Sequence, residues 1–205
     1  METALEIIQT WINNSKYKVN VIPRSDMVDK CEEVLGITEH STLGTMINHV
    51  GGLSVANGVI RHFGGNNMFG LSIKAVNLVA DCKPNRIKNA LIVADDVYGG
   101  LFAISNSTLW APQGKMIYLP PDSYVWENLN IGHSAFVEWS MSESVKLFYN
   151  KYKNLPIERN IPFNNVVNYM PPLWSQNLSE NNIDYSLVDS LKMLKIRSEL
   201  LEQLL

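Results

Sequence analysis

The stretch LIVADDVYGGLFAIS, from Leu91 to Ser105, indicates two strands joined by a glycine turn. Its apolar runs are rich in β-branched and aromatic side chains, which favour strands over residues 90–97 and 101–105. Gly99 and Gly100 supply the turn, because glycine reaches positive φ without a Cβ clash. We therefore predict a hairpin of antiparallel strands here.

The chain after this hairpin continues the same pattern. Residues 115–119 indicate a third strand, which ends at Pro120–Pro121. A short connection over residues 124–129 then leads to a helix from about Ser134, and Ser142 can cap its continuation. Strands that follow one another through short turns predict an α+β fold, with a mainly antiparallel sheet flanked by helices.

The N-terminal third is predicted to be mostly helical. Apolar residues at helical spacing indicate a first helix, and residues 19–22 form a short extended stretch. Ser25 and Ser41 are the predicted N-caps of two further helices, since a serine hydroxyl accepts a free amide of the first turn. Residues 53–63 then predict a strand pair around Asn57–Gly58, a type I′ turn sequence.

A chain of 205 residues suits one domain with a sizeable core. We expect four parts: a helical part over 1–40, an α+β core over 41–153, an irregular Pro- and Asn-rich segment over 154–182, and a helix over 183–205. The last segment is amphipathic and needs a surface to cover. That surface is either its own domain or a second copy in a homodimer.

Composition and charge exclude several classes of partner. The net charge is −3 and no dense Lys/Arg run occurs, so we expect no nucleic acid partner. No apolar run reaches the roughly 18 residues of a membrane span, and the first residues lack a signal-peptide pattern. We interpret Cys31 and Cys82 as buried free thiols. These features predict a cytoplasmic protein with no membrane partner.

No sequence motif for catalysis or metal binding occurs. The four histidines do not pair at metal-ligand spacing, and there is no H-E-x-x-H or G-x-S-x-G. We therefore expect no catalytic residue, no metal site and no cofactor.

Asp95 and Asp96 are the first candidates for a functional site. Successive side chains of a strand point to opposite faces, so the two carboxylates diverge and cannot act as a coupled pair. We expect one to accept backbone amides of the turn over 98–100, and the other to face solvent or a cleft. The alternative is that one of them binds a metal or polar ligand. Gly99 and Gly100 could separately admit a ligand's phosphate, although no G-x-G-x-x-G or Walker pattern surrounds them.

Aromatic residues crowd the second half of the chain. Trp110 lies in the loop over 106–114 and is either exposed to a partner or packed down on the domain. The candidate ligand- or partner-binding residues are Asp95, Asp96, Gly99, Gly100, Trp110, Asp122, Trp126 and Glu127.

Several stretches resemble a family of uncharacterised bacterial proteins, a domain of unknown function. They are VADDVYGGLFAIS, GKMIYLPPDSYVWENLNIGHSAFVEWSMS, KLFYNKY and PPLWS, with similarity to D-D-V-x-G-G-x-F-A, A-P-D-x-L-x-W-E and P-P-L-W patterns, and also NGVIRHFG, which fits an N/D-G-W-L-R-x-L-G pattern. The likeness covers roughly residues 43–174. Val59 departs from the pattern, and so does Leu119–Pro120. This resemblance implies kinship and carries no established activity.

The order of elements is also similar to that of SMI1/KNR4-type (SUKH) domains. Those are α+β proteins that often bind other proteins, including as immunity proteins. This likeness, with the missing catalytic motifs, favours a non-enzymatic protein-binding module, immunity-like, in a bacterial cytoplasm. The alternative is a small-molecule or sugar-binding enzyme of unknown reaction that uses Asp95 or Asp96.

Overall fold

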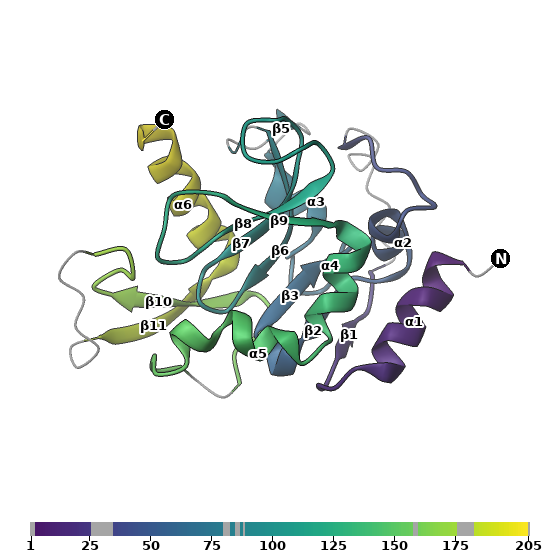
Figure 1. Cartoon of the computed structure of the whole chain (residues 1–205), viewed down its shortest axis with the longest axis horizontal. Helices are drawn as coiled ribbons and strands as arrows, with labels where there is room; N and C mark the ends of the chain where they lie inside the picture. The colour runs from purple at the N-terminus through teal and green to yellow at the C-terminus, as the bar shows by residue number, and fades with distance from the viewer. Residues whose placement is uncertain are drawn as a thin grey trace.

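A seven-stranded antiparallel sheet forms the centre of the protein (Figure 1). The computed structural model describes residues 3–25, 35–79, 83–84, 87, 89–157, 160–175 and 183–204. The strand order is β1-β2-β3-β6-β7-β8-β9. The bounds are Asn20–Ile22 (β1), Gly52–Val55 (β2), Ile60–Phe63 (β3), Ala90–Asp96 (β6), Leu101–Ser105 (β7), Lys115–Leu119 (β8) and Glu127–Gly132 (β9). The predicted α+β fold with a mainly antiparallel sheet is confirmed.

Helices and two short hairpins surround this sheet. The helices are Ala4–Asn14 (α1), Thr42–His49 (α2), Ile73–Asn77 (α3), His133–Ser140 (α4), Ser144–Phe148 (α5) and Ser190–Leu204 (α6), with 3-10 turns at Ala56–Gly58 (η2) and Asn150–Tyr152 (η4). One hairpin pairs Leu78–Val79 (β4) with Lys83–Pro84 (β5), and the other pairs Asn165–Met170 (β10) with Asp184–Asp189 (β11). Figure 1 shows α6 and the β10–β11 hairpin at one end of the sheet, with α1 at the opposite end.

Both faces of the sheet are covered, and β3 shows this residue by residue. The His62 ring lies 2.8 Å from the Ser140 hydroxyl of α4, so His62 faces the helices. The neighbouring Arg61 points the other way and donates to the Asn165 carbonyl at the start of β10. On the helix side, the Phe102 ring stacks on Tyr118 at 4.5 Å and meets Phe136 at 4.7 Å. The sheet is therefore a central layer with little solvent-facing surface.

The local signals in the N-terminal third predict its elements well. Thr3 and Glu6 form a reciprocal capping box at the start of α1. The Ser41 hydroxyl accepts the amide of Gly44 at the start of α2, as expected. Asn57, at φ 59°, and Gly58, at φ 91°, turn the chain between β2 and β3. The helix predicted after Ser25 and the two cysteines lie outside the described residues.

Five strands were missed by the sequence interpretation, namely the two-residue β4 and β5 and the longer β9, β10 and β11. The connection expected over 124–129 is in part β9, an edge strand in which half-buried Leu129 and Ile131 alternate with exposed asparagines. The segment expected to be irregular contains β10, and the predicted C-terminal helix begins with β11 and becomes helical only at Ser190. β10 and β11 stabilise each other by pairing, which local periodicity does not reveal.

The C-terminal helix is amphipathic, as predicted, and its apolar side packs on its own chain. Leu194 and Leu201 are 5% and 6% exposed within the monomer, whereas Ile196 is 43% exposed. A homodimer through this helix stays a prediction, and it would have to use a surface other than the buried side of α6.

Candidate functional site

Asp96 lies at the end of β6, and its carboxylate accepts four hydrogen bonds. One oxygen accepts the backbone amides of Tyr98 and Gly100, each at 2.9 Å. The other accepts the hydroxyls of Tyr118 at 2.8 Å and Tyr149 at 3.1 Å. The residue is fully buried, so Asp96 is the turn acceptor that strand geometry predicts, and it also connects two aromatic side chains.

Gly100 leaves the space that this arrangement needs. A Cβ at this position would lie 2.3 Å from a carboxylate oxygen of Asp96 and 2.6 Å from the Tyr118 hydroxyl oxygen. Gly99 instead adopts φ +93°, a conformation that favours glycine. The two glycines thus have structural reasons for being there that involve no bound phosphate.

Asp95 points to the opposite face and forms a buried ion pair. Its carboxylate accepts Nε and Nη2 of Arg61 at 2.8 Å and 2.6 Å, and Arg61 also donates to the carbonyls of Phe163 and Asn165. Burial raises the pKa of the Asp95 carboxyl, and Arg61 opposes that rise. Asp95 and Arg61 are 3% and 1% exposed. The expectation that one of the two aspartates faces solvent or a cleft is therefore wrong, because both faces of the sheet are covered.

The other predicted carboxylates gather around one tyrosine. Asp122 accepts the Tyr152 hydroxyl at 2.6 Å and the Lys151 ammonium at 3.1 Å, while Glu127 is exposed on β9. The pKa of Tyr152 is raised by burial, then by Asp122, with smaller effects of Asp96 and Glu127. Three of the four candidate carboxylates thus lie within electrostatic reach of one phenol, and Asp95 does not belong to this group.

Trp110 and Trp126 pack against each other. Their ring centroids lie 5.6 Å apart, Trp126 is 6% exposed and Trp110 is half-buried. The chain neighbours of the two tryptophans are the exposed residues, since Leu109 and Val125 have 64% and 69% of their surface open to solvent. In this loop the Trp110 side chain packs against Trp126, whereas the side chain of the preceding residue, Leu109, is exposed.

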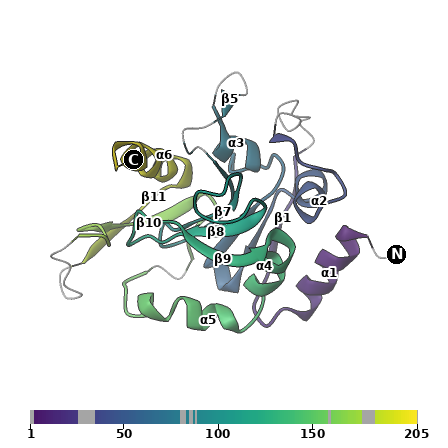
Figure 2. The ribbon, with the colours of Figure 1, turned by 45° about the horizontal axis from the view of Figure 1, so that its top comes forward.

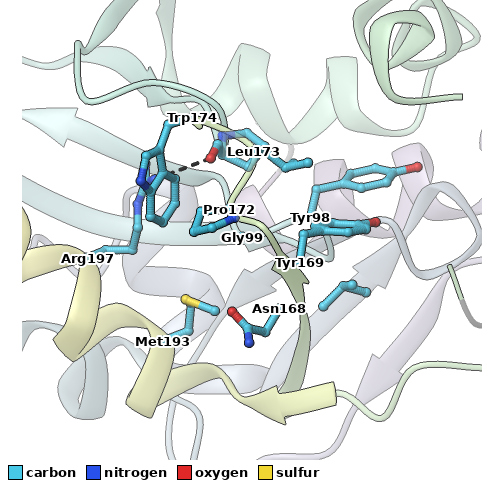
Figure 3. A pocket seen from close by; sticks show the side chains of 11 residues that line it. Tyr98, Gly99, Asn168, Tyr169, Pro172, Leu173, Trp174, Met193 and Arg197 are labelled. Atoms are coloured by element: carbon cyan, nitrogen blue, oxygen red, sulfur yellow. Dashed lines mark hydrogen bonds between the residues drawn. The ribbon is translucent and has the colours of Figure 1, made fainter. Parts of the chain in front are cut away.

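A small pocket lies where the β6–β7 turn meets β10 and α6 (Figure 3). Its volume is about 20 Å³, which is room for about one water molecule. The residues that line it are Tyr98, Gly99, Pro121, Val167, Asn168, Tyr169, Pro172, Leu173, Trp174, Met193 and Arg197. A space of this size cannot hold a sugar or another metabolite.

Arg197 closes this pocket and was missed by the sequence interpretation. Its guanidinium donates to the carbonyls of Pro120 and Ser123, each at 2.8 Å, and lies 5.2 Å from the Trp174 ring centroid (Figure 3). Burial lowers the pKa of Arg197, yet a guanidinium remains charged in proteins. The sequence signal that could have identified Arg197 as a buried residue is its position on the apolar side of α6, three residues after Leu194.

Three of the stretches that carry the family resemblance meet at this pocket. Tyr98 and Gly99 come from the first stretch, Pro121 from the second, and Pro172 to Trp174 from PPLWS. The chain is thus an α+β protein, and the stretches that resemble the family lie together around a buried group of carboxylates, tyrosines and one arginine.

The chain belongs to the family described as "Protein of unknown function DUF2625", whose model matches residues 1–193. It is 30% identical over 149 residues to the uncharacterised protein YbfG of Escherichia coli K12, covering 72% of this chain and 68% of that protein. It is 28% identical over 145 residues to an uncharacterised protein of Haemophilus influenzae, covering 69% and 64%. The predicted kinship with an uncharacterised bacterial family is confirmed.

Two other kinds of feature are absent from the described residues. None of the described helices is long and apolar enough to cross a membrane. Within the same ranges, no three His, Cys, Asp or Glu side chains come together as a metal ion would require.

Proposed function

We propose that this protein is a non-enzymatic protein-binding module of the bacterial cytoplasm. The supporting observation is the pair of exposed side chains Leu109 and Val125, each adjacent in sequence to a tryptophan of the Trp110–Trp126 contact. The ring contact holds the two loops together, so little conformational entropy is lost when a partner covers these side chains. We call Leu109, Trp110 and Val125 the loop surface.

The partner that fits the loop surface is a protein with an apolar depression and a basic rim. Leu109 and Val125 offer apolar area for the centre of an interface, and Trp110 offers the aromatic surface typical of binding energy hot spots. Glu127 is exposed directly after the Trp126 position, and the chain carries a net charge of −3. Opposite charge on the partner would speed association and orient it.

The competing enzyme hypothesis loses its main support. It needs Asp95 or Asp96 in an open site, whereas Arg61 occupies the first and four donors occupy the second. An immunity-like role is the form of protein binding that the likeness to SUKH domains favours, since an immunity protein acts by binding alone.

The test uses the full chain as bait in native bacterial lysate and compares four forms. The wild type, Leu109→Asp and Val125→Asp report on the loop surface, and Met68→Asp is the matched control because Met68 is 82% exposed in the turn between β3 and α3. A recovered protein is then purified and titrated against each form by calorimetry. Losing one buried Leu or Val side chain removes about 1.5–3 kcal/mol, so each loop variant should bind at least tenfold more weakly.

Met68→Asp should bind as the wild type does. The proposal is wrong if no recovered protein depends on Leu109 or Val125, or if Met68→Asp weakens binding as much as the loop variants. Circular dichroism of all four forms should be the same, because the substituted side chains are exposed.

A further inference from the structure

The hairpin of β10 and β11 lies at one end of the molecule, next to α6 (Figures 1 and 2). Its two strands pair antiparallel along their whole length, from Asn165 opposite Asp189 to Met170 opposite Asp184, with no bulge. A hairpin has one outer edge on each strand, and the backbone hydrogen bonds show which groups each edge presents.

The β11 edge presents backbone groups that have no partner. Alternate residues of an antiparallel pair bond to each other, and the residues between them point their N–H and C=O groups away from the partner strand. Val167 of β10 donates its N–H to the Val97 carbonyl, so it points away from β11. Leu187 lies directly opposite Val167 and therefore points away from β10, as does Tyr185 two residues earlier. Within the described part of the chain, no hydrogen bond reaches the N–H or C=O groups of Tyr185 and Leu187.

The other edge strands of this protein are guarded, whereas β11 is not. Proteins protect edge strands from pairing with other chains by bulges, by lysine or proline, or by short length. β9 has a bulge in which Asn130 adopts φ 59°, and Lys115 donates to the Asn130 carbonyl at 3.4 Å. β1, at the opposite edge of the sheet, has only three residues. β11 has six residues, a regular register and neither proline nor lysine, so it is the described edge best suited to receive a further strand.

The side chains of β11 select the strand that it receives. Tyr185 is 37% exposed and Leu187 is half-buried, and both lie on the same side of the strand, so they offer apolar surface to an incoming strand. Asp184 and Asp189 are exposed at the two ends of β11. Asp189 accepts the Lys192 amide with one carboxylate oxygen only. A segment with a basic residue at each end would therefore place an opposite charge beside each aspartate.

A second copy of the chain fits this edge poorly. An antiparallel pair of two β11 strands with Tyr185 opposite Leu187 would bring each Asp184 within one position of the other copy's Asp189. Four carboxylates would gather along the contact, and each chain already carries a net charge of −3. Like charges across a sheet are destabilising, so the aspartates disfavour self-pairing while they admit a basic segment.

We propose that the outer edge of β11 binds an extended segment of another protein, with alternating apolar residues in its middle and lysine or arginine at both ends. The segment adds to the hairpin as a third strand and bonds to the free N–H and C=O groups of Tyr185 and Leu187. This inference concerns a surface apart from Leu109, Trp110 and Val125, so its failure would leave the proposed function standing.

The experiment titrates the full chain with a capped seven-residue peptide that has lysine at both ends and alternating threonine and valine between them. Two control peptides have glutamate at both ends, or proline in place of the central residue. We expect the lysine peptide to bind saturably and at least tenfold more tightly than either control. Hydrogen exchange of backbone amides locates the contact. Binding should slow exchange at Tyr185 and Leu187 at least tenfold more than at Ser186 and Val188, which already bond to β10.

Two variants test the charge preference. Asp184→Lys should weaken binding of the lysine peptide at least threefold and strengthen binding of the glutamate peptide. Glu138→Lys makes the same change of charge at an exposed position of α4, which lies away from the hairpin (Figures 1 and 2), and should leave the binding of both peptides unchanged. The thermal unfolding midpoints of both variants should match that of the wild type, because both side chains are exposed.

Five results would overturn the proposal. They are no saturable binding of the lysine peptide, unchanged exchange at Tyr185 and Leu187 on binding, and an Asp184→Lys variant that binds both peptides as the wild type does. Equal binding of the proline peptide would indicate an ionic contact without an added strand. A dimer in sedimentation, with Tyr185 and Leu187 protected in the absence of peptide, would place a second copy on this edge.

Discussion

Acidification should destabilise the protein through two buried histidines. His62 is fully buried with its ring 5.0 Å from that of Phe136, and burial, with a smaller effect of His133, lowers its pKa to about 3. Burial alone lowers the pKa of His133 to about 4. In the unfolded chain both side chains regain the ordinary pKa of about 6.5. The folded state therefore binds fewer protons at these two histidines, and their contribution to stability falls as the pH drops below about 6.5. The raised pKa of the Asp95 carboxyl acts in the opposite direction.

The size of this effect follows from proton linkage. At pH 5.0 an unfolded histidine is almost fully protonated while His133 in the folded chain is almost fully neutral, so its contribution to stability falls by about 2 kcal/mol. The lower pKa of His62 gives a loss of similar size, so the two together lower the free energy of unfolding by about 4 kcal/mol between pH 7.5 and pH 5.0.

Urea denaturation followed by circular dichroism at these two pH values measures the effect. His133→Phe should lose about 2 kcal/mol less on acidification than the wild type, because phenylalanine has no proton to bind. His49→Asn is the control, since His49 is exposed, and it should lose as much as the wild type. The reasoning is refuted if His133→Phe and the wild type lose the same free energy to within about 0.5 kcal/mol. Comparing each variant with the wild type cancels the contributions of all other titrating groups.

Three further predictions concern the aspartates of β6. Gly100→Ala should destabilise the fold by about 2 kcal/mol or more in thermal unfolding, because its Cβ would lie 2.3 Å from an Asp96 oxygen, whereas Gly132→Ala meets no atom within 4 Å and should be nearly neutral. Tyr149→Phe removes one hydrogen bond to a buried carboxylate and should cost about 1.5–3 kcal/mol in urea denaturation, and a smaller cost than 0.5 kcal/mol would contradict the assigned bond. Arg61→Met should cost about 3–5 kcal/mol by leaving Asp95 unpaired, and adding Asp95→Leu should recover much of that loss in a double-mutant cycle.

The parts of the fold that could be predicted from the sequence are those with local causes. β7 and β8 have the predicted bounds. A glycine turn precedes β7 and a proline pair follows β8, so each apolar run specifies a buried strand without information from distant residues. The Ser41 cap is likewise set by residues three positions apart. β10 and β11 depend on each other for pairing, and their side chains alternate too weakly to indicate a strand. β9 has an alternating Leu129 and Ile131, which the sequence interpretation overlooked.

The candidate site could be predicted only as far as strand geometry reaches. Alternation along β6 correctly separates Asp95 from Asp96, and the glycines indicate the turn that Asp96 holds. The partners of the two carboxylates could not be predicted, because Arg61 and Tyr149 lie 34 and 53 positions away in sequence.

The residues whose polar groups or space are taken up inside the fold and the residues that stay exposed to a partner are different sets. Asp96, Gly100 and Arg197 have their polar groups or their space taken up by neighbouring residues, so substitutions there change the fold before they change any binding. Leu109 and Val125 are the opposite case, because both side chains are exposed. The family likeness therefore carries over the architecture, whereas the partner has to be argued from the exposed residues of each protein separately.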